Sequence, residues 1–524
     1  MKRASTYKRH SGGIYTPGGF GMPRVAEQVE PWRVDAGNGF INDAAIVSGH
    51  PLYDASHNRR LLERESQITE AFNAIEPALK DIAAQQSQDG FAERAASMVN
   101  DRLGIKLSPC LFRTDWLHPL NMREIYAQAV FETFKRLADQ NFDRSHADLF
   151  EGESADELIR NWGFHAIDIS PCADGRLSGV VDYILRIPGS IVAHRKSFAG
   201  AMFDIEESMR NWSEIELRRY RENIPNPASD PTRYLKIGVY HFSSSDPSHE
   251  GCAAHGSNER LAAQALLDRL NAFAQGIENT HCCGASVAVL LVGVDTDTDA
   301  IKVHVPDANG SISVDRFLDN KVLHAATQNM AREAAKEAIR LAVAEAAGVA
   351  PDDPATEGMR WFCGYLLKNN IAQIEYVRAY HNGQYDNLGH TERLITVGEG
   401  FDTVQLRNLA YQAQMDTVEE GAPDMDVGIK IFKHTHVERG LPAPVLVHFK
   451  YDGKVPGSRE RAEQKTRRLI DAIRARYESL VRDGWIYTRG MLENKSATTG
   501  LEELDDNFAR RADGTHACGC NEGV

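Results

Sequence analysis

The sequence has 524 residues, of which 42% are hydrophobic and 25% are charged, and its formal net charge is −15 at pH 7. This length exceeds what one hydrophobic core usually serves, so we expect about three folded units. The acidic balance argues against nucleic-acid binding, which needs Lys and Arg to neutralise phosphates, and no apolar run reaches the ~18 residues that would cross a membrane.

The first part of the chain divides into a basic arm and a helical region. Residues 1–45 combine Lys and Arg with many glycines and contain no long apolar run, which is typical of a disordered arm. No apolar segment with a cleavage site follows the basic start, so we expect no secretory signal. From about residue 60 the apolar positions take helical spacing, and one expected helix face consists of Ile68, Phe72, Ile75, Leu79 and Ile82.

Beyond residue 160 the pattern predicts α/β structure. Strand-like runs at 164–170, 234–242 and 287–294 are separated by long helical segments such as 258–276, which favours a largely parallel sheet. An Ala-rich helix is expected over 325–347, followed by a loop over 350–358. Strand candidates at 427–432 and 445–451 and a charged helix from about 459 to 482 then predict a separate C-terminal domain.

Two of the predicted strands end in residues that can bind a metal. Cys172, Asp174 and Arg176 directly follow the first strand, whereas the strand at 234–240 ends in His241 and a loop leads from there to Cys252. The carboxyl ends of parallel strands meet at one edge of a sheet. Two thiolates and one imidazole would form a three-ligand zinc site that leaves the fourth position to water, which implies catalysis. A structural zinc would need a fourth ligand, for which His249 and His255 are the nearest candidates.

The motif around Cys172 resembles that of a known enzyme family. The run Cys172-x-Asp174-x-Arg176, with a later strand-end His and a Cys, is similar to the β-type carbonic anhydrases, whose pattern is C-x-D-x-R followed by H-x-x-C. The segments DISPCADGRL, PTRYLKI, HCCGAS, GVDTDTDAI, DVGIKIF and VPGSRER resemble the carboxysomal shell carbonic anhydrases, a divergent β-class branch once treated as a separate ε class. The resemblance extends from about residue 150 to 465.

This resemblance implies a fold and a division of the chain. It implies an α/β protein with a disordered basic arm at 1–45, a helical N-terminal domain at 46–147 and a β-carbonic-anhydrase-like zinc catalytic domain at 148–396. The C-terminal domain at 397–524 would be a degenerate copy of the catalytic one. That region contains no cysteine before Cys518, so we expect one Zn²⁺ per chain, bound by Cys172, His241 and Cys252.

One alternative for the imidazole ligand stays open. His249 lies three residues before Cys252 and fits the short H-x-x-C spacing, whereas ten residues separate His241 from Cys252. We favour His241, because the end of a strand fixes the direction from which a ligand approaches, and because the carboxysomal branch carries this longer insertion.

The resemblance also implies the reaction. Zinc lowers the pKa of its bound water, and the resulting hydroxide attacks CO₂. Asp174 would accept the hydrogen bond of that hydroxide, and Arg176 would keep the carboxylate ionised. His249, His255 and His390 are candidates for carrying the proton to solvent, because imidazole titrates in the right range.

The same resemblance predicts location and partners. The protein would be a lyase that interconverts bicarbonate and CO₂ and supplies CO₂ to Rubisco inside the carboxysome of a bacterial cytoplasm, as a homodimer or a higher homo-oligomer. The arm, with its positive charge and aromatic side chains, could bind Rubisco or a shell protein.

Two other classes compete with this interpretation. A zinc deaminase also uses His/Cys/Cys ligands, but its P-C-x-x-C signature is absent, since Pro171 and Cys172 are followed by Ala-Asp-Gly. A scaffold protein with a structural zinc would show a fourth protein ligand. We expect Cys282 and Cys283 to pack in a core and the Cys518-Gly-Cys520 tail to be unstructured. Asp295, Asp297 and Asp299 imitate the start of a calcium loop, but Ala300 occupies its glycine position.

Overall fold

The computed structural model describes residues 49–113, 120–141, 155–188, 191–223, 232–280, 286–354, 356–386, 389–400, 406–496 and 500–504. The predicted arm, Cys282, Cys283 and the Cys518-Gly-Cys520 tail lie outside these ranges. Within them, no helix combines the length and the apolar character that crossing a membrane requires.

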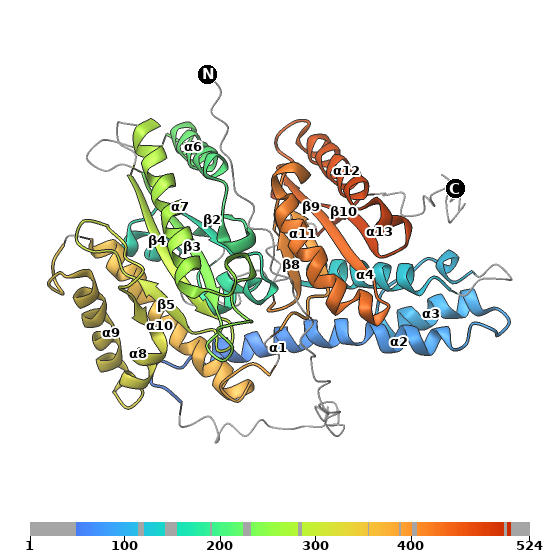
Figure 1. Cartoon of the computed structure of the whole chain (residues 1–524), viewed down its shortest axis with the longest axis horizontal. Coiled ribbons are helices and arrows are strands. Elements are labelled where there is room, and N and C mark those ends of the chain that lie inside the picture. The colour runs from blue at the N-terminus through green and yellow to red at the C-terminus, as the bar shows by residue number, and fades with distance from the viewer. Residues whose placement is uncertain are drawn as a thin grey trace. The chain divides into compact units, whose positions relative to one another are not determined.

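The described chain starts with a group of helices, drawn in blue and cyan in Figure 1. They are α1 (Ala55–Asn73), α2 (Ile75–Ala83), α3 (Phe91–Leu103) and α4 (Met122–Asn141). The five residues of the predicted apolar face are all buried, which confirms the helical spacing, although this face spans two helices because α1 ends at Asn73.

The second part of the chain contains a six-stranded mixed sheet. Its strands are β1 (Ala166–Pro171), β2 (Val192–Arg195), β3 (Arg233–Phe242), β4 (Ser286–Asp295), β5 (Ile301–His304) and β6 (Leu318–Asp319), in the order β2-β1-β3-β4-β5-β6. The first four strands are parallel to one another. Strand β5 is antiparallel to β4, and β6 is antiparallel to β5. This confirms the predicted α/β domain with a largely parallel sheet.

Helices enclose this sheet and explain why its central strands are apolar. They are α5 (Ala155–Trp162), α6 (Ile205–Arg221), α7 (Glu259–Thr280), α8 (Asn320–Thr327), α9 (Arg332–Ala347) and α10 (Glu357–Tyr380). Helix α7 packs on β3 and β4, and β3 is buried from Tyr234 to Phe242. The Ala-rich stretch at 325–347, predicted as one helix, is the end of α8 and the whole of α9, with a break at 328–331.

A second sheet forms the C-terminal domain, drawn in orange and red in Figure 1. Its strands are β7 (Leu394–Gly398), β8 (Ala410–Ala413), β9 (Ala443–Tyr451), β10 (Ile486–Asn494) and β11 (Glu502–Glu503), in the order β11-β10-β9-β7-β8. Its helices are α11 (Val418–Thr435), α12 (Ser458–Arg476) and α13 (Glu478–Arg482).

One predicted strand of this domain is wrong. Residues 427–432 lie inside helix α11, which begins after Thr417, whose hydroxyl accepts the backbone N–H of Glu420. The buried positions of α11 recur at helical spacing, from Val418 through Met425 to Phe432. A short apolar run fits both a strand and a buried helix segment, so this stretch alone resembled a strand. The helical spacing appears only when the whole segment from 418 to 435 is considered.

The two sheets share one topology. The order β8-β7-β9-β10-β11 repeats the order β2-β1-β3-β4-β5, and in both sheets the first four strands are parallel and the fifth is antiparallel. The C-terminal domain therefore has the strand arrangement of the first five strands of the six-stranded sheet, as expected for a degenerate copy.

Candidate metal centre

Cys172 is held at the carboxyl end of β1 by backbone hydrogen bonds. Its N–H donates to the carbonyl of Val239 on β3 at 3.1 Å, and it pairs with Phe198 in an isolated parallel bridge. The next residue, Ala173, donates its N–H to the carbonyl of Phe198 at 2.9 Å. The thiol therefore has a fixed position between two segments of the sheet.

His241 and Cys252 reach the same edge from β3 and from the loop that follows it. His241 is the penultimate residue of β3 and is buried. Cys252 precedes a short 3₁₀ helix (Ala253–His255), and its carbonyl accepts the N–H groups of His255 and Ser257 at 3.0 Å each. His241 thus lies at the end of a strand, and Cys252 lies directly before a short helix.

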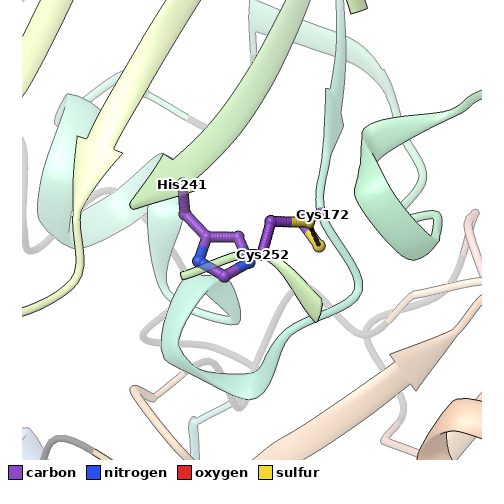
Figure 2. A group of neighbouring side chains, drawn as sticks. All are labelled: Cys172, His241 and Cys252. Atoms are coloured by element: carbon purple, nitrogen blue, oxygen red, sulfur yellow. Dashed lines mark hydrogen bonds between the residues drawn. The ribbon is translucent and has the colours of Figure 1, made fainter. Parts of the chain in front are cut away.

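Figure 2 shows the imidazole of His241 pointing toward the two cysteine sulfurs. The Sγ atoms of Cys172 and Cys252 are 4.0 Å apart, and the ligand atoms of all three residues lie within 4.8 Å of one another. Two sulfurs bound tetrahedrally at ~2.3 Å from one zinc ion would be separated by about 3.8 Å. Neither ring nitrogen of buried His241 has a hydrogen-bond partner in the described part of the chain. The donor set, its spacing and the unsatisfied imidazole all fit a zinc ion.

The two thiols differ in how easily they ionise. The hydrogen bond with Cys252, together with burial, raises the pKa of Cys172 well above its ordinary value, whereas the same hydrogen bond lowers the pKa of Cys252. Metal ligation requires both groups as thiolates, so a divalent cation would offset the cost of ionising Cys172.

Asp174 and Arg176 form a buried bidentate ion pair next to this group. Arg176 donates from Nε to Oδ1 of Asp174 at 2.9 Å and from Nη2 to Oδ2 at 2.8 Å. Burial alone would raise the pKa of Asp174, but the Arg176 guanidinium holds it well below the usual range, with help from His241 and His390. Oδ2 of Asp174 lies 3.6 Å from Nε2 of His241, so an ionised carboxylate lies beside the candidate metal position.

Of the three histidines proposed for proton transfer, His390 lies against this ion pair. Its Nε2 is 3.9 Å from Oδ2 of Asp174, and its Nδ1 is 2.8 Å from Oε1 of Glu392. Although burial opposes protonation, Asp174 and Glu392 raise the pKa of His390 to about 9. The side chain of His249 is 75% exposed and pairs with Asp246, and Nε2 of His255 lies 3.4 Å from the carbonyl of Gly200. Neither of these two belongs to the Cys172–His241–Cys252 group.

The C-terminal domain holds the loop that carries Asp174. The carbonyls of Ala173 and Gly175 accept the N–H groups of Gln412 at 3.1 Å and Asn408 at 2.7 Å. The N–H of Gly175 donates to Oε1 of Glu392 at 3.2 Å, and a Cβ atom at Gly175 would lie 2.4 Å from the Glu392 side chain. The loop conformation thus depends on residues more than 200 positions away in the sequence.

Sequence reasoning missed Glu392 and the backbone groups of Gln412 and Asn408. The one available signal was the acidic residue two positions after His390. That spacing is common in unrelated proteins, so it could not assign a role without the fold.

Comparisons with known proteins match the chain along most of its length. Models of the N-terminal, catalytic and C-terminal domains of the carboxysome shell carbonic anhydrase family match residues 50–142, 154–390 and 391–508. The carboxysome shell carbonic anhydrase of Halothiobacillus neapolitanus is 44% identical over 461 residues, which cover 87% of this chain and 90% of the relative. The protein of the same name from Prochlorococcus marinus (strain MIT 9313) is 46% identical over 474 residues, which cover 89% of this chain and 91% of the relative. That from Hydrogenovibrio crunogenus is 41% identical over 498 residues, which cover 93% of this chain and 90% of the relative.

Proposed function

The chain belongs to the carboxysome shell carbonic anhydrase family, and from this premise we propose that it interconverts CO₂ and bicarbonate at one zinc ion bound by Cys172, His241 and Cys252. The observation that carries the assignment of ligands is the buried group itself. Its two sulfurs are 4.0 Å apart, and its imidazole has no other hydrogen-bond partner among the described residues.

The donor set favours zinc over other metals. Two thiolates and one imidazole are soft to borderline ligands, which suit Zn²⁺ and not the hard cations Mg²⁺ and Ca²⁺. When bound, zinc lowers the pKa of a coordinated water toward neutrality and so supplies a nucleophile for CO₂. The group of close ligand atoms contains no fourth protein ligand among the described residues, which favours a catalytic over a structural site.

Asp174 would accept a hydrogen bond from the nucleophile and so direct a lone pair at the carbon of CO₂. The bidentate contact with Arg176 keeps the Asp174 carboxylate ionised, since both acceptor oxygens face fixed donors. The same contact prevents the carboxylate from rotating toward the metal position and occupying it. Asp174 therefore acts on the substrate side, and Arg176 acts through Asp174.

We propose that His390 exchanges protons with the site: with a pKa of about 9 it is protonated at neutral pH, so it can donate the proton that dehydration of bicarbonate consumes. Its ring nitrogens face Asp174 on one side and Glu392 on the other, and its side chain is about one quarter exposed. It therefore connects the buried ion pair with solvent, which the exposed His249 does not.

The C-terminal domain carries no second zinc site in this proposal. The N–H of Cys172 donates to Val239, and by the same pattern the N–H of Glu399 donates to His448 at 2.8 Å. Glu399 therefore corresponds to Cys172, because each donates its N–H to the neighbouring strand. Lys450 corresponds to His241, because each lies two residues after the residue that accepts this hydrogen bond. The carboxylate of Glu399 is occupied, since its Oε2 accepts the backbone N–H of Lys450 at 2.8 Å. This favours one zinc per chain and a supporting role for the second domain.

Family membership assigns the protein to the carboxysome. There we propose that it supplies CO₂ to Rubisco, that it works as a homodimer or a higher homo-oligomer, and that the basic arm binds Rubisco or a shell protein. We also propose that the basic arm ends at residue 45, the helical domain at 147 and the catalytic domain at 396.

The test combines zinc analysis with stopped-flow CO₂ hydration on the purified full chain, its Cys172→Ser variant and its Asp174→Ala variant. We expect about one zinc per wild-type chain, loss of zinc and turnover together in Cys172→Ser, and loss of turnover with zinc retained in Asp174→Ala. A wild-type chain that binds zinc but does not hydrate CO₂ would instead support a structural zinc or another hydrolytic reaction.

A further inference from the structure

The loop from 243 to 251 joins His241 to Cys252 and has no helix or strand of its own. A free loop of this length has many conformations, and ordering it costs roughly 1–2 kcal/mol per residue. The distance between the imidazole and the second sulfur therefore depends on what holds the loop. Three consecutive serines, Ser243, Ser244 and Ser245, form its start.

The buried carboxylate of Asp297 holds two of these serines. Its Oδ2 accepts the Oγ–H of Ser243 at 3.0 Å and the N–H of Ser245 at 2.6 Å, it also accepts the hydroxyl of Ser245, and it lies 3.4 Å from Oγ of Ser244. Asp297 is fully buried. Burying a carboxylate is costly unless donors compensate it, and here the donors come from Ser243 and Ser245.

The residue before Asp297 connects the same turn to His241 and Arg176. Thr296 donates from its N–H and from its hydroxyl to the carbonyl of Phe242, at 2.9 and 3.1 Å, and Phe242 directly follows His241. The Thr296 hydroxyl oxygen in turn accepts Nη1 of Arg176 at 3.5 Å. The turn between β4 and β5 is thus bonded to the end of β3 as well as to the loop.

Arg176 holds the other end of the loop. Its Nη1 donates to the carbonyl of Glu250 at 2.9 Å, two residues before Cys252. The loop is therefore fixed near both proposed ligands, by Asp297 at its start and by Arg176 at its end.

The three aspartates that imitate a calcium loop each bind different partners. Asp295 accepts the N–H and hydroxyl of Ser244 and pairs with Lys321. Asp299 accepts hydrogen bonds from Nε2 of Gln373 and from the hydroxyl of Tyr385. These partners follow the aspartates in the sequence, whereas the serines precede them. Asp295 thus holds Ser244, Asp297 holds Ser243 and Ser245, and Asp299 binds partners outside the loop.

We propose that Asp297 is a positioning residue of the zinc site, because its carboxylate fixes the start of the loop between His241 and Cys252 and so sets the separation of these two ligands. The proposal rests on the proposed function, since it takes His241 and Cys252 as zinc ligands. It explains how ten residues between the two ligands can replace the short spacing of other β-type enzymes without loosening the site.

The test uses the full chain with Asp297→Asn, which keeps the size of the side chain but removes its charge. Three readouts are measured: the visible spectrum of the Co²⁺-substituted protein, the rate of zinc loss to a chelator, and CO₂ hydration. We expect an altered Co²⁺ spectrum, zinc loss that is faster by about 10-fold or more, and a lower kcat, as for residues that orient metal ligands. Ser245→Ala removes one donor and keeps the backbone N–H, so it should change all three readouts less and in the same direction.

Asp307→Asn is the matched control. Asp307 accepts backbone N–H groups of Asn309 and Ser311 on an exposed turn, and its variant should behave like the wild type. A wild-type Co²⁺ spectrum and zinc-loss rate in Asp297→Asn overturn the proposal, and if that variant does not fold, the same result in Ser245→Ala overturns it. Failure of the wild type to bind zinc would overturn the proposed function instead.

Discussion

Arg176 and Asp174 are locked together by two parallel hydrogen bonds, Nε to Oδ1 at 2.9 Å and Nη2 to Oδ2 at 2.8 Å, in a buried environment. The same guanidinium donates from Nη1 to the carbonyl of Glu250 at 2.9 Å. A single side chain therefore fixes both the ionised carboxylate and the loop that leads to Cys252, and its replacement should affect both.

We expect Arg176→Lys to lower CO₂ hydration by roughly 10- to 100-fold, the usual cost of losing a residue of the outer shell of a metal site. Lysine keeps the charge but cannot make the bidentate contact. Without that contact, burial should raise the pKa of Asp174, so activity should be lost further as the pH falls. The pH profile of kcat/KM from pH 6 to 9 checks this, and an acid limb identical to that of the wild type would contradict it.

Replacing one sulfur should remove the metal itself. We expect Cys172→Ser to retain less than about one tenth of the wild-type zinc after dialysis, because a hydroxyl does not ionise at neutral pH as a thiol can. Cys110→Ser is the control, since Cys110 is half-buried and lies outside the ligand group. Equal zinc contents in the two variants would exclude Cys172 as a ligand.

His390 makes the stability of the zinc-free protein depend on pH. Its pKa is raised from 6.5 to about 9 in the folded state, so its contribution is fully present below pH 6.5 and is lost as the pH rises through 9. The difference of about 2.5 units corresponds to at most about 3 kcal/mol. Denaturant unfolding of the metal-free wild type and His390→Asn at pH 6 and pH 9.5 measures it. We expect the gap between the two proteins to shrink at the higher pH, and a constant gap would show that Asp174 and Glu392 do not stabilise the charged ring.

The prediction that Cys172, His241 and Cys252 lie together rested on two things: the carboxyl ends of parallel strands meet at one edge of a sheet, and the sequence resembles the carboxysomal shell carbonic anhydrases. The structure brings their ligand atoms within 4.8 Å of one another. Their role as zinc ligands, and the choice of His241 over His249, which rested on the strand end and on the longer insertion of that branch, stay predictions. Glu392 and Asp297 could not be assigned, because their contacts depend on how distant segments pack: Glu392 meets Gly175 across 217 positions and Asp297 meets Ser243 across 54. The error at 427–432 has a local cause, since an apolar run shorter than two helical turns fits both periods.

The Gly175 position gives the last prediction, because it tests whether the contact with Glu392 supports the site. A Cβ at Gly175 would lie 2.4 Å from Cγ and Oε1 of Glu392, which also accepts the Gly175 N–H. Gly175→Ala should therefore displace Glu392 or the loop, and we expect a loss of 1–3 kcal/mol in unfolding free energy, as for other overpacked sites, together with at least about 10-fold lower CO₂ hydration. Gly364→Ala is the matched control: it lies in helix α10 with nothing within 4 Å of its Cβ position, and alanine there should be neutral or stabilise by about 0.5–1 kcal/mol. If Gly175→Ala matched the control in both stability and turnover, the contact between Glu392 and the Asp174 loop would have no part in holding the site.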